Sequence, residues 1–296
     1  MSNLQGAILG MCNPLLDISA EVPEELLQKY ELSLNNAILA EEKHLPLYDE
    51  LVKSFPVQYI AGGATQNSIR VAQWMSKIPG CTSYFGAVGT DAYGEQLEKC
   101  ALEDGVRVIY QKNPSVPTGT CAVLVHGGER SLVANLAAAN TFTASHLETA
   151  EAKDAVEQAK LYYISGFFLT VSVDSILSIA KHAVDTNKIF SMNLSAPFLV
   201  QFFGDQMASV MPYADFVFGN ESEAAAYGAA KDYGSDLPTI ALRLAAQPKA
   251  SGTRPRVVVF TQGADSTIVA ANGEVTVYPV DRLPRELLVD TNGAGD

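Results

Sequence analysis

Short apolar runs separated by amphipathic stretches dominate the pattern of hydrophobic and polar positions along the chain. Where apolar residues recur at helical spacing, as at Ile176, Ile179, Ala180 and Ala183, the pattern predicts a helix. Val71, Trp74, Met75 and Ile78 repeat at the same spacing and predict a helix with these residues on its inner face. The runs with the length and composition of buried strands are residues 7–12, 57–61, 84–88, 161–165, 189–194, 216–219 and 257–261.

The order of these elements indicates the fold class. From about residue 145 onward, helical and strand patterns alternate, which predicts a parallel sheet covered by helices on both faces, an α/β fold. In such sheets ligands bind beyond the carboxyl ends of the strands. Binding and catalytic residues are therefore expected in the segments that follow each strand.

Two segments, about 13–61 and 106–136, have a different pattern. Their apolar runs are short and partly alternating, and the turn signals Asn113-Pro114 and Gly127-Gly128 separate some of them. We expect a small, mostly β subdomain that folds over one edge of the main sheet as a lid and excludes water from a transfer reaction. Residues 1–296 are then one domain with this lid. The runs assigned to the lid are 37–40, 57–61, 106–111, 120–126 and 131–134.

Composition narrows the class of ligand. The chain has 20 basic and 33 acidic residues, a formal net charge of −13, which argues against binding nucleic acid or anionic membranes. Neither a signal peptide nor an apolar stretch of membrane-spanning length is recognisable, so we expect a cytoplasmic protein, with a nuclear location as the other option. The four cysteines lack CxxC spacing and are expected to be free thiols.

The last seven residues, 290–296, read DTNGAGD and carry the strongest chemical signal. Gly293 and Gly295, beside Asn292 and Ala294, let backbone N–H groups converge on one point, which suits a phosphoryl group that carries negative charge through its transition state. Asp296 is placed to accept the proton of an acceptor alcohol. The other interpretation is a glycine-rich turn capped by aspartate.

Two further motifs follow strands near the N-terminus. Asn13-Pro14-Leu15-Leu16-Asp17 places a carboxylate where it can accept hydrogen bonds from two neighbouring sugar hydroxyls, although a helix cap or strand-end turn has the same composition. In residues 62–67, GGATQN, paired glycines permit close approach of a ligand, and Asn67 would lie about one turn inside a helix. A common strand-to-helix turn is the alternative.

A fourth motif, Asn220-Glu221-Ser222-Glu223, follows the run at 216–219. Asn220 and Glu223 lie on one helical face and can orient waters around Mg²⁺, which takes few protein ligands. The alternative is an N-cap with a capping glutamate. Arg130, in the expected lid, can either close on a transferring phosphate or remain a solvated turn residue.

These motifs recur after successive strands, where an open α/β sheet gathers them, and with them the chain resembles the ribokinase-like (phosphofructokinase-B type) carbohydrate kinases. The resemblance runs from about Gly10 to Asp296. GAGD and the N-x-x-E of Asn220 and Glu223 indicate the broad family, and three other strings narrow the match to members that phosphorylate a nucleoside. These strings are NPLLD at 13–17, FFLTVS at 167–172 and NLSAPF at 193–198.

The resemblance implies a three-layer α/β/α sandwich with a small β lid, and transfer of the γ-phosphate of ATP to the 5′-hydroxyl of adenosine with Mg²⁺, by a monomer. It implies that Asp17 holds the ribose hydroxyls, that Asp296 is the base and that Arg130 reaches the transferring phosphate. Further residues implied on the nucleoside side are Asn13, Leu39, Gly63, Ala64, Asn67, Cys121, Leu132, Ala134, Phe167, Phe198 and Asn292. On the ATP side they are Asn193, Asn220, Glu223, Thr261 and Gly263, with Glu223 holding the metal through water.

One departure from the family affects the expected activity. Members of the family continue past GAGD with a helix and further elements of the nucleotide pocket, whereas this chain ends at Asp296. We therefore expect the chain to bind adenosine and to turn over little ATP. The competing hypotheses are a sugar kinase of the same fold, against which Phe167 and Phe198 argue, and a catalytically incomplete nucleoside-binding protein.

Overall fold

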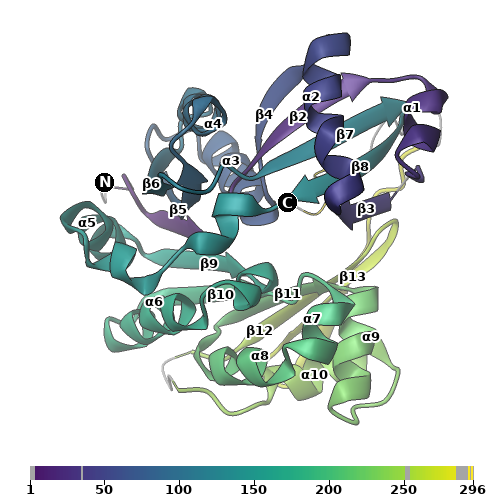
Figure 1. The fold of residues 1–296 in the computed structure, drawn as a ribbon. Coiled ribbons are helices and arrows are strands. Elements are labelled where there is room, and N and C mark those ends of the chain that lie inside the picture. The colour runs from purple at the N-terminus through teal and green to yellow at the C-terminus, as the bar shows by residue number, and fades with distance from the viewer. Residues whose placement is uncertain (1–3, 35, 251–253, 285–292, 294, 296) are drawn as a thin grey trace. The chain divides into compact units, whose positions relative to one another are not determined.

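Parallel strands that alternate with helices form the first of two units into which the internal contacts divide the chain. The computed structural model describes residues 4–34, 36–250 and 254–284 together with Gly293 and Gly295. Residues up to 11 and 143–284 belong to the first unit, and residues 12–142 to the second. Figure 1 labels the helices and strands of both units.

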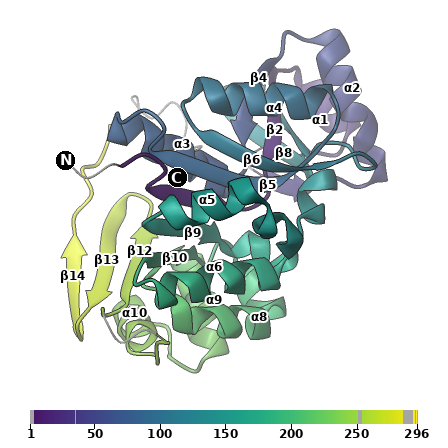
Figure 2. The same cartoon turned by 90° about the vertical axis from the view of Figure 1, so that its left-hand side faces the viewer.

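The first unit contains a sheet with the strand order β14-β13-β12-β11-β10-β9-β1. Strands β1, β9, β10, β11 and β12 run parallel, and the β13–β14 hairpin continues the sheet in antiparallel pairing (Figure 2). The strands are β1 (Ile8–Met11), β9 (Leu161–Ser165), β10 (Ile189–Asn193), β11 (Phe216–Asn220), β12 (Val257–Gln262), β13 (Asp265–Ala271) and β14 (Glu274–Tyr278). The helices are α5 (Ala150–Gln158), α6 (Val173–Asp185), α7 (Pro197–Phe202), α8 (Gly204–Val210), α9 (Glu221–Ala230) and α10 (Leu237–Ala245), with short 3₁₀ turns η3 (Ala144–Glu148), η4 (Gly166–Thr170) and η5 (Met211–Tyr213).

These strands confirm the α/β class. The runs predicted at 161–165, 189–194, 216–219 and 257–261 all lie in parallel strands, with bounds that differ by at most one residue. The strands are buried because their apolar side chains pack against helices. On the helix side, Ile176, Ile179, Ala180 and Ala183 of α6 are each 3% exposed or less. The carboxyl ends of β9 to β12 lie at one edge of this sheet, since the strands are parallel.

The second unit contains a five-stranded sheet with the order β3-β8-β7-β2-β4. One face of this sheet packs on α1 (Glu24–Lys29) and α2 (Leu45–Ser54), where Ile18, Leu124 and Val133 meet Leu47 and Leu51 in a core cluster. The strands are β2 (Leu15–Glu21), β3 (Asn36–Leu39), β4 (Gln58–Gly62), β7 (Thr120–His126) and β8 (Glu129–Asn135). The remaining elements of the unit are η1 (Glu42–His44), α3 (Ala64–Ser76), β5 (Thr82–Gly89), α4 (Ala92–Glu103), β6 (Arg107–Asn113) and η2 (Ala137–Thr141).

This sheet is formed by segments predicted for the lid, with one exception. The run at 106–111 was expected in the lid, but it lies in β6, which pairs in parallel with β5 and has no partner in the five-stranded sheet. That part of the prediction is wrong. The alternation of apolar residues indicates a strand and says nothing about which strand it pairs with. The division into one domain with a lid remains a proposal.

The prediction of which residues lie on the inner face of α3 is also wrong. Trp74 and Met75 were expected on its inner face, but their exposed fractions are 75% and 68%. The buried residues of α3 are instead Thr65, Gln66, Ile69 and Gln73. The apolar spacing failed because the helix ends at Ser76, before Ile78, and because two glutamines occupy its inner face.

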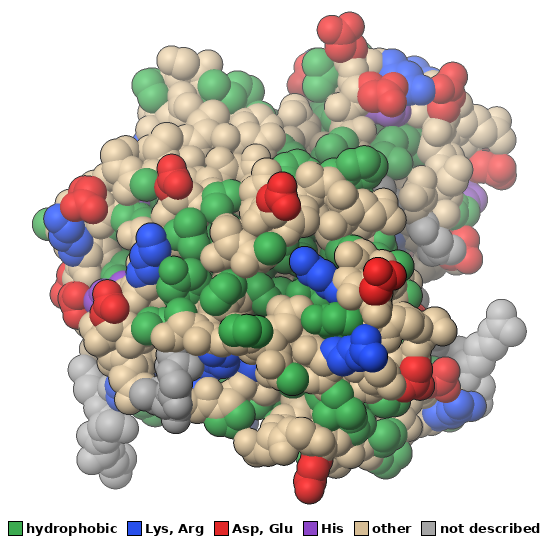
Figure 3. Space-filling model, turned by 90° about the horizontal axis from the view of Figure 1, so that it is seen from below, with side chains coloured by type: hydrophobic (Ala, Val, Ile, Leu, Met, Phe, Trp, Pro, Cys, Tyr) green, Lys and Arg blue, Asp and Glu red, His purple; other side chains and the backbone are tan. Residues whose placement is uncertain are grey.

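Among the described residues, no helix combines the length and apolar character that crossing a membrane requires. On the face seen in Figure 3, basic and acidic side chains are scattered among neutral and hydrophobic ones, without a continuous basic patch.

Candidate active site

Four predicted nucleoside-side residues form one row across the five-stranded sheet. Leu39 of β3 pairs with Ala134 of β8, Ala134 pairs with Cys121 of β7, and Cys121 pairs with Asp17 of β2. Partners in register project from the same face of a sheet, so this row lies on one face, and Leu132 joins it two residues before Ala134. The flanking residues Ile18, Ala122 and Val133 point to the opposite face, into the core with α1 and α2. The structure thus brings these five predicted residues together.

The carboxylate of Asp17 is seated over a glycine. A Cβ atom at Gly62 of the neighbouring strand β4 would lie 2.2 Å from Oδ1 and 2.4 Å from Oδ2 of Asp17, so only glycine leaves room for this side chain. Burial raises the pKa of the Cys121 thiol well above its ordinary value, and the negative charge of Asp17 raises it further. Cys121 is therefore a neutral, apolar neighbour of the carboxylate.

Asn13 and Gly63 lie in direct contact beside this row. Gly63 has φ = 98°, and a Cβ there would lie 2.3 Å from the Asn13 carbonyl oxygen. The Asn13 amide is buried and donates to Asn140 Oδ1 (3.0 Å) and to the Ala139 carbonyl (3.3 Å). Asn67 is half-buried in the first turn of α3, where its N–H donates to the Gly63 carbonyl (2.9 Å). The two motifs NPLLD and GGATQN are therefore packed together.

Two other predicted residues of this unit, Ala64 and Arg130, have a less defined setting. Ala64 is exposed at the start of α3. Arg130 is half-buried near the start of β8, opposite Val125 and next to the Gly127-Gly128 turn. Its predicted contact with a transferring phosphate stays a prediction.

In the first unit, the predicted ATP-side residues lie at the carboxyl ends of neighbouring strands. Asn193 ends β10, Asn220 ends β11, and Thr261 of β12 pairs with Asn220. The Thr261 hydroxyl donates to the Gly219 carbonyl at 3.5 Å. Gly263 follows in the turn between β12 and β13, with φ = 56°. Parallel pairing therefore gathers these residues at one edge of the sheet, as the sequence predicted.

Asn220 and Glu223 form a capping box at the start of α9. Asn220 Oδ1 accepts from the Glu223 N–H (2.9 Å), and Glu223 Oε2 accepts from the Asn220 N–H (3.0 Å). Burial raises the pKa of the Glu223 carboxyl, although the backbone N–H groups of Asn220 and Ser195 oppose the shift. The structure thus bears out the capping interpretation, and a capping carboxylate can also orient metal-bound water.

Ser195 is a residue of this edge that the sequence did not single out. Its backbone has φ = 68°, a left-handed conformation that is uncommon for a residue other than glycine. Its N–H donates to Asn193 Oδ1 (2.8 Å), and its hydroxyl accepts from the Gly166 N–H (2.8 Å). Its backbone also bonds Glu223. Its sequence signals were its place in the NLSAPF string and its position two residues after Asn193, at the end of a strand.

The two predicted purine-side aromatics meet in the first unit. Phe167 of η4 and Phe198 of α7 have ring centroids 6.3 Å apart, with their planes tilted by 44°. Phe198 is 43% exposed, which leaves part of its ring accessible to a ligand. The pair follows the carboxyl ends of β9 and β10, the same edge as Asn193.

The DTNGAGD motif is described only in part. Gly293, with φ = 75°, and Gly295 are exposed. Asn292, Ala294 and Asp296 lie outside the described residues. In the described part of the chain, no cluster of three or more His, Cys, Asp or Glu side chains could ligate a metal directly. A single carboxylate such as Glu223 fits Mg²⁺ held through water, because Mg²⁺ keeps several of its waters.

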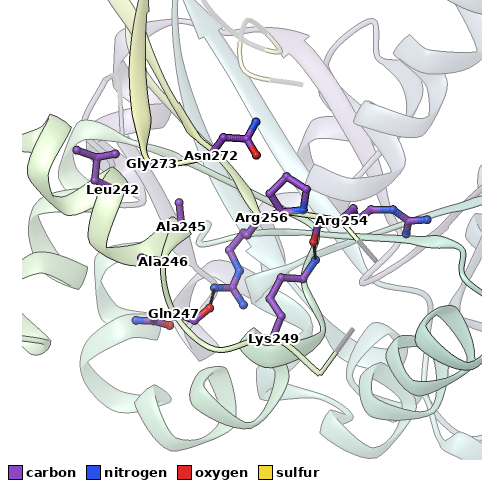
Figure 4. A pocket seen from close by; sticks show the side chains of 10 residues that line it. Leu242, Ala245, Ala246, Gln247, Lys249, Arg254, Arg256, Asn272 and Gly273 are labelled. Atoms are coloured by element: carbon purple, nitrogen blue, oxygen red, sulfur yellow. Dashed lines mark hydrogen bonds between the residues drawn. The ribbon is translucent and has the colours of Figure 1, made fainter. Parts of the chain in front are cut away.

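A basic pocket of about 360 Å³ at the opposite ends of these strands has a structural role (Figure 4). Arg256, which directly precedes β12, is 1% exposed. Its guanidinium donates to five backbone carbonyls, those of Met211, Ala214, Leu244, Gln247 and Pro248. Nearby, Lys249 and Arg254 pair with the buried Asp215, so the cations of this pocket are already engaged by the protein.

A parallel sheet with polar residues at the carboxyl ends of its strands is an architecture that binds small ligands at that edge. The chain belongs to the pfkB family of carbohydrate kinases, whose model matches residues 25–296. This finding confirms the predicted family and its three-layer α/β/α fold. It also confirms the enzyme class, a phosphotransferase with an alcohol group as acceptor, and implies ATP as the phosphoryl donor.

Three relatives illustrate the similarity. The chain is 57% identical to adenosine kinase 2 of Arabidopsis thaliana over 296 residues, which is 100% of this chain and 86% of the relative. It is similar to the structure of Anopheles gambiae adenosine kinase in complex with P1,P4-di(adenosine-5) tetraphosphate (TM-score 0.89, 50% identity, 98% and 86% coverage). It is also similar to Schistosoma mansoni adenosine kinase in complex with adenosine in an occluded loop conformation (TM-score 0.89, 37% identity, 98% and 86% coverage).

Proposed function

We propose that this chain is an ATP-dependent adenosine kinase, which phosphorylates the 5′-hydroxyl of adenosine to give AMP in purine salvage. The observation that carries the proposal is the row Leu39–Ala134–Cys121–Asp17. It places one carboxylate at the end of a series of small and apolar side chains, a pattern that suits a ribose beside a flat base better than a free sugar, which needs more polar groups. The names of the relatives support the same acceptor.

The residue roles follow from the chemistry of the transfer. The 5′-oxygen of adenosine forms a bond to the γ-phosphorus of ATP, the bond from that phosphorus to the β–γ bridging oxygen breaks, and ADP leaves. Asp296 accepts the 5′-hydroxyl proton, and Arg130 and the backbone amides of Gly293–Gly295 stabilise the charge on the transferring group. Asp17 accepts hydrogen bonds from the ribose hydroxyls, with Asn13, Gly63, Ala64 and Asn67 on the same side. Phe167 and Phe198 contact the purine, and Asn292 is assigned to nucleoside binding as well.

We propose Mg²⁺ as the metal, with Glu223 holding it through water. The ion, when bound, neutralises charge on the phosphates. Glu223 and Asn220 orient its waters, and the neighbouring strand-end residues Asn193, Thr261 and Gly263 bind the nucleotide. The monomeric state and the cytoplasmic or nuclear location expected from the sequence stay predictions, which sedimentation and fluorescence microscopy of a tagged chain would check.

The test is phosphoryl transfer by the purified chain with ATP and Mg²⁺. ADP release and AMP formation are measured with adenosine, with 5′-deoxyadenosine, which lacks the acceptor oxygen, and with free ribose. The proposal expects AMP from adenosine and no product from 5′-deoxyadenosine. Turnover of ribose without turnover of adenosine would establish the sugar kinase. Calorimetric binding of adenosine without any turnover would establish the nucleoside-binding protein.

A further inference from the structure

The inner face of α3 is polar where a core helix is usually apolar. Gln66 is fully buried and Gln73, two turns further along the same face, is 7% exposed, while Trp74 and Met75 lie outside. A buried amide is costly unless its hydrogen bonds are made. The two glutamines therefore need separate explanations.

Gln73 has a complete set of partners and a structural role. Its Oε1 accepts from the Thr82 N–H (3.1 Å) and the Thr82 hydroxyl (3.0 Å). Its Nε2 donates to the Ile78 carbonyl (2.8 Å). These bonds join the end of α3 to the start of β5, away from the residues assigned to the nucleoside.

Gln66 is only half satisfied. Its Oε1 accepts from the Tyr110 hydroxyl at 2.7 Å, but within the part of the chain that the structure describes its Nε2 has no hydrogen-bond partner. Burial raises the pKa of Tyr110 well above its ordinary value, so the phenol stays protonated and donates this bond. An apolar side chain at position 66 would fill the same space without burying an unpaired amide. Filling the core therefore does not explain a glutamine here, which points to a role for its bond to Tyr110.

The position of Gln66 suggests that role. It lies in the first turn of α3, between Ala64 and Asn67, and the N-cap residue of this helix is Gly63, which provides no side-chain cap. Tyr110 packs edge-on against the buried ring of Tyr84, with centroids 6.3 Å apart and planes at 82°. The bond thus ties an otherwise uncapped helix start to a rigid pair of rings.

We propose that Gln66 is a positioning residue for nucleoside binding, which acts through its bond to Tyr110 by fixing the first turn of α3 and with it Asn67 and the Gly63 backbone. This inference rests on the proposed function. It predicts that losing the Gln66–Tyr110 bond reduces the affinity that depends on the ribose hydroxyls. Losing the bonds of Gln73 should reduce only the stability of the fold.

The experiment compares Gln66→Met, Tyr110→Phe and the double variant with Gln73→Met as the matched control. Adenosine affinity is measured by calorimetry, KM and kcat by ADP release, and stability by thermal unfolding. We expect Gln66→Met and Tyr110→Phe each to raise Kd and KM for adenosine by roughly five- to tenfold, with KM for ATP unchanged, because one buried hydrogen bond is lost. The double variant should have a Kd and KM for adenosine no higher than those of the single variant that binds adenosine less tightly, because both changes remove the same bond.

A second ligand separates positioning from stability. The ratio of the affinities for adenosine and 2′,3′-dideoxyadenosine should fall in Gln66→Met and Tyr110→Phe and stay at the wild-type value in Gln73→Met, which should lower Tm. If Gln66→Met and Gln73→Met change this ratio equally, or if neither Gln66→Met nor Tyr110→Phe changes it, the inference is wrong. Tyr110→Phe keeps the packed ring and tests the bond even if Gln66→Met fails to fold. An inactive wild type would contradict the proposed function, while the calorimetric ratio would still test Gln66.

Discussion

The carboxylate of Asp17 occupies the space that a side chain at Gly62 would need, with Oδ1 only 2.2 Å from the position of a Cβ there. The relationship connects neighbouring strands β2 and β4 and makes position 62 part of the site without contributing a functional group. It also yields a substitution that moves the carboxylate without removing it.

Gly62→Ala should therefore displace Asp17 and weaken adenosine binding by about tenfold, since a charged hydrogen bond is typically worth about 1.5–3 kcal/mol and would be only partly kept. The measurement is the adenosine Kd by calorimetry. Gly204→Ala is the matched control, because a Cβ at Gly204 meets no atom within 4 Å. An unchanged Kd in Gly62→Ala would show that the seat of Asp17 has no bearing on binding.

Asp17→Ala should weaken nucleoside binding far more than ATP binding. The loss of a charged partner to two hydroxyls is expected to cost roughly 1.5–3 kcal/mol. Calorimetry with adenosine and with 2′,3′-dideoxyadenosine measures it, and the variant should bind both ligands with similar affinity. If wild type already binds the two equally, Asp17 does not contact the ribose.

Glu223→Gln should separate the capping role from the proposed metal role. Burial raises the pKa of Glu223 in the folded chain, so the folded state holds this proton more tightly than the unfolded state does. The stability that the protonated form contributes is present below the ordinary glutamate pKa and is lost as the pH rises through the raised value. A glutamine keeps an acceptor for the Asn220 N–H and has no such loss.

The Gln variant should accordingly be at least as stable as wild type at neutral pH, and the difference should vanish below the ordinary glutamate pKa. Urea unfolding at both conditions measures it. Activity should fall and require more Mg²⁺, because the neutral amide attracts the hydrated ion less strongly. A variant that is less stable at neutral pH, with normal Mg²⁺ dependence, would leave Glu223 with a capping role alone.

Arg256→Met should be strongly destabilising. Removing the guanidinium takes one donor from each of five backbone carbonyls in a buried place, which is expected to cost about 3 kcal/mol. Arg282→Met is the control, because Arg282 is 74% exposed and pairs with an exposed Asp265. Thermal unfolding of both variants measures the difference, and equal Tm values would contradict the structural role of the buried arginine.

Asp296→Asn should retain adenosine binding while turnover falls by about 10²–10⁴-fold, the usual contribution of a general base. The chain's kcat and adenosine Kd are measured side by side. A near-normal kcat in the variant would show that Asp296 is not the general base. Loss of adenosine binding would instead assign Asp296 to substrate binding.

The sequence predicted the bounds of several strands closely. The runs at 161–165 and 120–126 coincide with β9 and β7, because each is a continuous apolar or β-branched segment. The prediction failed for the inner face of α3, where Gln66 and Gln73 replace the expected apolar residues. It also failed for the partner of β6, since pairing depends on the whole topology and not on the strand's own residues.

The candidate site was predicted as a set of residues but not as an arrangement. Phe167 and Phe198 do meet, and Asn220 and Thr261 do pair. The register that aligns Leu39 with Asp17 across four strands could not be read from a single chain, because it depends on turn lengths and on which strands are neighbours. Ser195 was missed because its contribution is made largely by its backbone.

The register of the β7–β8 hairpin has a consequence for how variation in this chain can be tolerated. His126 and Glu129 pair across the two-residue Gly127-Gly128 turn, and every later pair, including Cys121 with Ala134, is counted from there. If an inserted residue shifted the pairing by one position, Val133 would take the place of Ala134 beside Cys121, and a core side chain would point toward the ligand. A shift by two would keep the same faces and move the row sideways. The length of the Gly127-Gly128 turn thus helps to determine which side chains face a nucleoside, although the turn contacts none of those side chains.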